Sequence, residues 1–347
     1  ADPRTDPNAS DRGVSTMGSG NWSTNVYDAA QSYNAAAGRS AFHYDHVTKR
    51  STPHSAWKAH DDLDPRLASV RESRDSDEHP TSVAISVLFD VTGSMLRVPQ
   101  TLQTKLPELF GLLLRKGYVQ DPQIMFGAIG DATCDRVPLQ IGQFESDNRM
   151  DDQLGNILLE GGGGGQKRES YELALYFMAR HTSIDCHDKR GKRGYLFVIG
   201  DEMPYRRVRR AEVKEFIGDD LAEDIPIERI LAELQRMYEV YYILPAGSSY
   251  VGDAEVLGEW KGLLGQHVIE LDDPDGVCET IALTIGLAED AIDLDEGLEH
   301  LREVGATAQV ANVSKALASY ARTGGAVAVS GSLPGLDGVG DAGTTRL

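Results

Sequence analysis

Residues 83–94 read VAISVLFDVTGS, a mostly apolar run that ends in one acid and two hydroxyl side chains. Such a continuous run is typical of a strand that is buried on both faces of a parallel sheet. Asp90, Thr92 and Ser94 follow it at alternate positions and offer only oxygen ligands, which favours Mg²⁺ or Mn²⁺ over zinc. Because this loop carries a single carboxylate, a divalent ion held there would keep most of its charge and could bind an anionic ligand from outside.

Apolar runs and helical patterns alternate along the chain from residue 81 onward. After the first strand we expect helices at 98–116, 170–180, 208–217, 227–238, 254–264 and 275–287, strands at 123–131, 194–202, 240–246 and 267–271, and an edge strand at 138–144. Parallel strands need crossover connections, and helices supply them. The sequence therefore predicts an α/β fold, a mostly parallel sheet with helices on both faces.

The pattern divides the chain into four parts. Residues 1–80 are polar and punctuated, and we expect an irregular arm with a short helix at 27–37. Residues 81–290 form the α/β domain, and residues 291–323 form a helical extension. Residues 324–347 are rich in glycine and are expected to be a flexible tail.

Composition excludes several classes of protein. The 347 residues carry a net charge of -20, which argues against a broad surface for nucleic acid or anionic membrane. No apolar run reaches the roughly 18 residues of a membrane span, and the first residues lack the apolar core of a secretory signal, so we expect a cytoplasmic protein. Cys134, Cys186 and Cys278 are widely spaced and suggest neither a disulfide framework nor a cysteine-rich zinc site.

Further acids follow other expected strands. Asp201 and Glu202 end the run at 194–202, and Asp131 ends the run at 123–131. In an open α/β sheet, ligands bind at the carboxyl ends of the strands, so these acids are expected near Asp90. A glycine run at 161–165 precedes the helix at 170–180 and would let backbone approach a ligand closely.

The motif D-V-T-G-S-M at residues 90–95 resembles the first loop of the metal-ion-dependent adhesion site of von Willebrand factor A domains, whose pattern is D-x-[ST]-x-S. Asp90, Thr92 and Ser94 match this loop. Asp201, at the end of a later strand, is similar in position to the acid of the family's third loop.

The resemblance places the second loop at the glycine run and the helix start after it. Glu169 and Ser170 stand there as candidate metal ligands, and the family's usual threonine is absent. It extends over about residues 82–290 and implies a six-stranded Rossmann-like sheet in which residues 138–144 form an antiparallel edge strand. Residues 71–80, RESRDSDEHP, also resemble uncharacterised bacterial and phage proteins that carry such a domain.

In function, the resemblance implies a protein–protein interaction module without catalytic activity. Mg²⁺, or Mn²⁺ or Ca²⁺ in its place, would be held with one coordination position open for an Asp or Glu of a protein partner. Intracellular bacterial relatives often work beside AAA+ ATPases or in multi-protein assemblies, so an ATPase or a self-assembly partner is expected by analogy.

The rim of the expected site carries both signs of charge. Asp131 and Glu202 are expected on it, together with the arginines of the run after Asp201, namely Arg206, Arg207 and Arg210. Two interpretations stay open for these arginines: they pair with local acids on a helix face, or they steer an acidic partner segment toward the metal.

Two other functions remain as alternatives. A Mg²⁺-dependent phosphohydrolase of the haloacid dehalogenase type would use Asp90 as nucleophile, but such enzymes need a second acid two residues later, where this chain has Thr92. A structural component of a phage or cellular assembly, built through the arm and the tail, is compatible with the interaction module.

Overall fold

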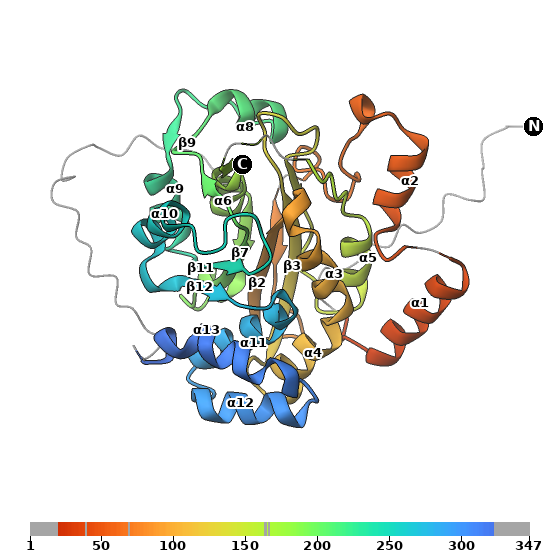
Figure 1. Ribbon diagram of the computed structural model, residues 1–347, viewed down its shortest axis with the longest axis vertical. Helices are drawn as coiled ribbons and strands as arrows, with labels where there is room; N and C mark the ends of the chain where they lie inside the picture. The colour runs from red at the N-terminus through yellow and green to blue at the C-terminus, as the bar shows by residue number, and fades with distance from the viewer. Residues whose placement is uncertain (1–19, 39, 69, 163–164, 166, 323–347) are drawn as a thin grey trace, which may run out of the picture.

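The structure is a computed structural model that describes residues 20–38, 40–68, 70–162, 165 and 167–322. The tail expected to be flexible, residues 324–347, lies outside this part of the chain. A six-stranded sheet forms the centre of the molecule, with helices on both of its faces (Figure 1). The predicted α/β, Rossmann-like class is therefore confirmed.

The central sheet has the strand order β12-β11-β7-β2-β3-β4. Its strands are β2 (Ser82–Asp90), β3 (Asp121–Ile129), β4 (Leu139–Ile141), β7 (Gly194–Ile199), β11 (Tyr238–Pro245) and β12 (Val268–Leu271). All neighbours are parallel except β4, which pairs antiparallel with β3 at the edge, as predicted. β2 lies between β3 and β7, so the loop after Asp90 begins in the middle of the sheet.

Each face of the sheet has its own apolar core. Val87 and Phe89 of β2 belong to one core and Leu88 to the other, and all nine residues of the strand are buried. The first core contains residues of α3 (Arg97–Thr104), α4 (Leu106–Phe110), α5 (Arg149–Gly155), α11 (Val277–Ala288), α12 (Leu294–Glu303) and α13 (Val310–Arg322). The second contains residues of α6 (Tyr171–Arg180), α7 (Asp185–Asp188), α8 (Arg210–Phe216), α9 (Ile227–Leu234) and α10 (Ala254–Leu264).

Two helices that the sequence pattern predicts as continuous are divided. The helix expected at 98–116 splits into α3, α4 and a π-helical turn at Gly111–Arg115. Pro107 causes the first break because it has no N–H to bond the carbonyl of Gln103, which instead accepts the hydroxyl of Tyr27 at 2.7 Å. The pattern from residue 291 to 321 divides into α12 and α13 because Gly305, with φ of +88°, ends the first helix.

The N-terminal segment is more regular than its composition suggests. The helix expected at 27–37 is α1 (Thr24–Ala36), but a second helix, α2 (His43–Ser51), and a strand, β1 (Arg71–Ser73), are also present. β1 pairs in parallel with β6 (Thr182–Ile184), outside the central sheet. The segment therefore packs against the α/β domain through hydrogen bonds as well as apolar contacts.

Two further pairs of short strands lie in the connections. They are β5 (Arg168–Glu169) with β8 (Met203–Pro204), in parallel, and β9 (Arg207–Val208) with β10 (Ile225–Pro226), antiparallel. Among the described residues, none of the helices combines the length and apolar character needed to span a membrane.

Candidate metal centre

The acids predicted to meet at one edge of the sheet do so. Asp90 is the last residue of β2, and Asp131 and Asp201 each follow two residues after the ends of β3 and β7. Because these three strands are adjacent and parallel, their carboxyl ends face the same edge. All three carboxylates are buried, with exposed fractions of 0 to 1%.

Asp90 is held in one orientation by two donors. Its Oδ1 accepts the backbone N–H of Thr92 at 2.6 Å, and its Oδ2 accepts the hydroxyl of Tyr171 at 3.1 Å. Thr92 is itself buried, and Ser94 lies in the short 3₁₀ turn Gly93–Met95, although its side chain is outside the described part of the structure. The first loop thus turns sharply directly after β2.

Tyr171, the first residue of α6, is a site residue that the sequence did not reveal. Its ring lies among aromatic neighbours, with centroid distances of 5.4 Å to Trp260 and 6.0 Å to Tyr242. A Cβ at Gly200 would lie 2.0 Å from the Tyr171 hydroxyl oxygen, so the ring fits only because residue 200 is glycine. The one signal in the sequence is this glycine immediately before Asp201.

Hydrogen bonds to Asp201 and Glu202 fix the loop after β7. Oδ2 of Asp201 accepts the backbone N–H of Ser249 at 2.8 Å. The backbone carbonyl of Glu202 accepts both the Tyr242 hydroxyl at 3.1 Å and the Trp260 indole N–H at 2.8 Å. These bonds place the predicted third loop with little freedom.

The first two residues of the glycine run, Gly161 and Gly162, lie against the first loop. The N–H of Gly161 donates to the carbonyl of Val91 at 3.1 Å, and the N–H of Gly93 donates to the carbonyl of Gly162 at 3.3 Å. The chain then enters β5, whose pairing with β8 places Glu169 beside the loop after β7. The second-loop position of Glu169 is thus adjacent to the other two loops.

Ser170 links the second loop to the loop after β3. Its hydroxyl accepts the N–H of Ala132 at 2.9 Å, and its own N–H donates to the carbonyl of Gly130 at 3.3 Å. These contacts give Ser170 a structural role. The proposal that it binds a metal stays a prediction.

The site contains several buried carboxyl groups close together. Burial is the largest cause that raises the pKa of Asp90, Glu169 and Glu202, and neighbouring carboxylates add to it: Asp201 acts on Asp90, and Asp90 acts on both glutamates. Oε2 of Glu169 and Oε2 of Glu202 are buried, and the carboxyl groups of these two residues hydrogen-bond each other. Burial of several carboxyl groups together is costly unless they are protonated, paired or bound to a cation.

The donor set fits a hard divalent cation. Asp90 and Asp201 provide carboxylate oxygens, and Thr92 and Ser94 are hydroxyl residues, the ligand types that Mg²⁺ and Ca²⁺ prefer. Within the described residues, no group of three or more His, Cys, Asp or Glu side chains is arranged to hold a metal ion. A site with two carboxylates and two hydroxyls does not require such a group.

Some residues of the predicted rim form hydrogen bonds or ion pairs within the protein, and Arg207 is exposed. Asp131 accepts the Tyr205 hydroxyl at 3.1 and 3.2 Å, so it is tied to the loop after β8. Arg206 pairs with Glu259 at 2.6 Å, and the backbone N–H of Arg210 donates to Asp224 at 3.0 Å. Arg207 is exposed on β9. Arg206 is therefore paired, but with an acid of α10 and not with a local acid on its own helix face.

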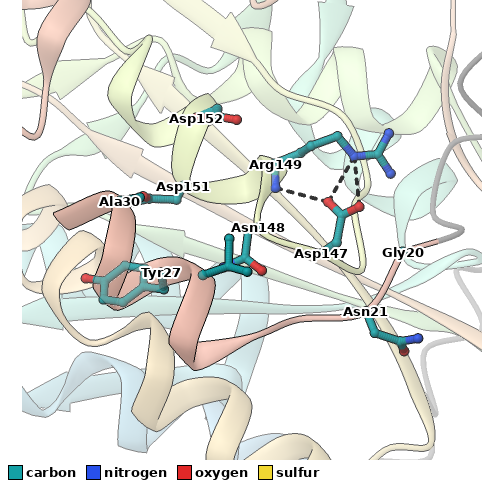
Figure 2. Close-up of a pocket in the computed structure, with 10 residues that line it drawn as sticks. Gly20, Asn21, Tyr27, Ala30, Asp147, Asn148, Arg149, Asp151 and Asp152 are labelled. Atoms are coloured by element: carbon teal, nitrogen blue, oxygen red, sulfur yellow. Dashed lines mark hydrogen bonds and ion pairs between the residues drawn. The ribbon is translucent and has the colours of Figure 1, made fainter. Parts of the chain in front are cut away.

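A separate pocket of about 370 Å³ lies at the start of α1 and the start of α5. Figure 2 shows Tyr27 and Ala30 of α1 among the residues that line it, together with Asp147, Arg149, Asp151 and Asp152. Asp147 is paired with Arg149, whose Nε lies 2.9 Å from its Oδ1. None of the predicted site residues lines this pocket. The pocket is therefore separate from the candidate metal centre at the carboxyl edge of the sheet.

Comparisons with known proteins give only remote similarity. No protein-family model matches the sequence, and no curated protein matches it significantly. The pilus adhesin SpaC from Lactobacillus rhamnosus GG, in its open conformation, has a similar structure, with a TM-score of 0.43, 10% identity, and coverage of 62% of this chain and 31% of the adhesin.

Two other solved structures are similar at a comparable level. Proximal thread matrix protein 1 from the mussel byssus has a TM-score of 0.38 and 13% identity, over 59% of this chain and 47% of that protein. A von Willebrand factor type A protein from Catenulispora acidiphila has a TM-score of 0.36 and 11% identity, over 60% and 42%. This chain spans less than half of each of the three proteins, and TM-scores below 0.5 identify neither family nor function.

Proposed function

We propose that this chain is a non-catalytic protein-interaction module of the von Willebrand factor A type. Asp90, Thr92, Ser94 and Asp201 would hold Mg²⁺, or Mn²⁺ or Ca²⁺, with Glu169 near the ion. The cation would offset the buried negative charge and offer a coordination position to an Asp or Glu of a protein partner. One observation carries the proposal: the buried carboxylates of Asp90 and Asp201 follow the adjacent parallel strands β2 and β7 at the same edge of the sheet.

Two features favour binding over catalysis. Thr92 stands where a phosphohydrolase that uses Asp90 as nucleophile would need a second acid. Both oxygens of Asp90 already accept a hydrogen bond from within the protein, an arrangement that suits a fixed ligand or its support better than an attacking group. Arg207 on the rim would attract an acidic partner segment, and an AAA+ ATPase or a further copy of this chain remains a proposed source of that segment.

Calorimetric titration with Mg²⁺ and Mn²⁺ tests the metal site. We expect saturable binding by the wild type and none by Asp90→Asn, because the central carboxylate is lost. Asp151→Asn is the matched control: it makes the same change at a partly buried acid in the separate pocket and should bind like the wild type. Equal binding by wild type and Asp90→Asn would refute the site.

The open coordination position needs its own measurement. With Mn²⁺ bound, water proton relaxation reports the water molecules on the ion, and acetate serves as a minimal carboxylate ligand. We expect acetate to lower the relaxation enhancement in the wild type, since a carboxylate would displace water. Mg²⁺-dependent hydrolysis of p-nitrophenyl phosphate that is lost in Asp90→Asn would instead support the phosphohydrolase.

A further inference from the structure

Helix α2 of the N-terminal segment holds the backbone of Leu159, two residues before the glycine run. The N–H of Leu159 donates to Oδ1 of Asp45 at 3.0 Å, and its carbonyl accepts Nζ of Lys49 at 2.5 Å. Asp45 and Lys49 are four residues apart on α2 and pair with each other at 2.8 Å. One residue of the segment that enters the site is therefore fixed at both of its backbone polar groups.

The residues on either side of Leu159 are held as well. The side-chain amide of Gln140 bonds both the N–H and the carbonyl of Leu158, each at 2.8 Å. The carboxylate of Glu160 accepts the N–H groups of Arg136 and Val137, each at 2.9 Å, and lies 2.8 Å from Nε2 of His54. Residues 158–160 are thus a fixed anchor, and residues 43–54 supply part of it.

This anchor continues directly into the candidate metal centre. Gly161 donates to the carbonyl of Val91, and Gly162 accepts from the N–H of Gly93. Val91 and Gly93 flank Thr92, whose own N–H bonds Asp90. Hydrogen bonds therefore join α2 to Leu159 and join Gly161 and Gly162 to the first loop, and only Glu160 separates these two sets along the backbone.

We propose that Asp45 and Lys49 are positioning residues for the metal centre, so that the N-terminal segment is part of the functional site although it precedes the α/β domain. This inference rests on the proposed function. Charge-assisted bonds to both backbone groups of Leu159 limit where Gly161 and Gly162 lie, and these glycines fix the loop that carries Thr92.

Asp45 and Lys49 are suited to mutation because neither side chain belongs to an apolar core. The side chains of Lys49 and Asp45 are 35% and 16% exposed, and Thr48 is the one buried residue of α2. Loss of the contacts that Asp45 and Lys49 make with Leu159 should loosen the anchor while both apolar cores remain intact. The double variant Asp45→Asn with Lys49→Met is therefore expected to fold.

The test compares this double variant with a matched control, Lys58→Met with Asp61→Asn, which removes an exposed ion pair of the same segment. In metal-free protein, hydrogen exchange at the Leu159 and Gly161 amides should be about tenfold faster in the Asp45/Lys49 variant and unchanged in the control. The Mg²⁺ dissociation constant should rise about tenfold in the variant alone. Lys49→Arg keeps a cationic donor and should stay close to the wild type.

The readouts separate the two proposals. Absence of Mg²⁺ binding by the wild type would refute the proposed function, and the exchange rates would still decide whether α2 holds the anchor. If the wild type binds Mg²⁺ and the Asp45/Lys49 variant binds it equally well, the inference is overturned. Unchanged exchange at Leu159 and Gly161 would overturn it as well.

Discussion

At the scale of single residues, Tyr171 is the support on which the geometry of Asp90 depends. Tyr171→Phe removes the donor to Oδ2 and leaves the aromatic packing in place. We expect an Mg²⁺ dissociation constant about tenfold higher, because a ligand that loses its supporting hydrogen bond is less well oriented. Titration calorimetry measures the change. Tyr176→Phe, on the same helix but bonded to Asp219, is the control, and an equal effect of both variants would contradict the role of Tyr171.

Substitution of Glu169 is expected to stabilise the protein in the absence of metal. Its carboxylate is 1% exposed, and four other carboxylates raise its pKa after burial itself. In EDTA near neutral pH, Glu169→Gln should therefore raise the melting temperature by about 2 °C or more, since glutamine avoids the cost of either protonating this carboxyl group or burying its charge. Mg²⁺ should stabilise the wild type more than the variant.

Glu160→Gln is the contrasting control for this measurement. Glu160 is also buried, but its carboxylate accepts two backbone N–H groups and contacts His54. The same substitution should lower the melting temperature there, because donors would lose a charged acceptor. A fall of similar size in both variants would show that Glu169 is a stabilising residue, contrary to our expectation.

The sequence predicted the carboxylates of the site but not their supports. Asp90, Asp131 and Asp201 were predicted to lie close together because each follows an apolar run, and parallel strands end at one edge. Tyr171 gave no such signal, since an aromatic residue at the start of a helix is ordinary core composition. Ser170 was assigned from motif position alone, and its bond to Ala132 depends on tertiary contacts that no local pattern encodes.

At the scale of secondary structure elements, the junction of β7 and α6 needs glycine at position 200. A methyl group there would meet the Tyr171 hydroxyl oxygen at 2.0 Å and its ring carbon Cζ at 2.6 Å. Gly200→Ala should lower the free energy of unfolding by about 1–3 kcal/mol because the ring must move. It should also weaken Mg²⁺ binding, since the donor to Asp90 moves with the ring. Chemical denaturation and calorimetry measure the two effects.

Gly258→Ala in α10 is the matched control for this variant. Position 258 has open space around the site of a new Cβ, and it lies inside a helix. Alanine should raise the free energy of unfolding there by about 0.5–1 kcal/mol through helix propensity. If Gly200→Ala were also stabilising, the close approach of Tyr171 would not constrain this position.

Element boundaries were predicted less well than element types. The continuous leucine pattern at 98–116 concealed the break at Pro107, because periodicity records which face is apolar and not whether the backbone hydrogen bonds are complete. Helix α2 was missed for a related reason. Its sequence, HYDHVTKRS, has little apolar character, and contacts such as the one between Asp45 and Leu159 hold it in place.

At the scale of the whole molecule, acid should destabilise the fold through His267, which lies where β12 meets α13. Its ring stacks on Tyr241, burial lowers its pKa below the usual 6.5, and Glu239 and Arg193 act on it in opposite directions. A lowered pKa contributes stability that is present above about pH 6.5 and is lost as the pH falls through the folded-state value. His267→Gln should reduce the difference in unfolding free energy between pH 7.5 and pH 5.5. An unchanged difference would contradict this assignment.

The C-terminal helices share a core with the sheet, so we expect no separate unfolding step at the boundary drawn near residue 290. Leu317 of α13 and Leu283 of α11 are completely buried in the same core. Leu317→Ala and Leu283→Ala should each lower the free energy of unfolding by about 2–5 kcal/mol. Each should shift one common transition, followed by Trp260 fluorescence and by circular dichroism, whereas Lys315→Ala, whose side chain is 72% exposed, should change little. If Leu317→Ala instead produced an early loss of helix that leaves the Trp260 signal unchanged, the two helices would be an independent appendage, and the domain boundary drawn from the sequence would be a thermodynamic one as well.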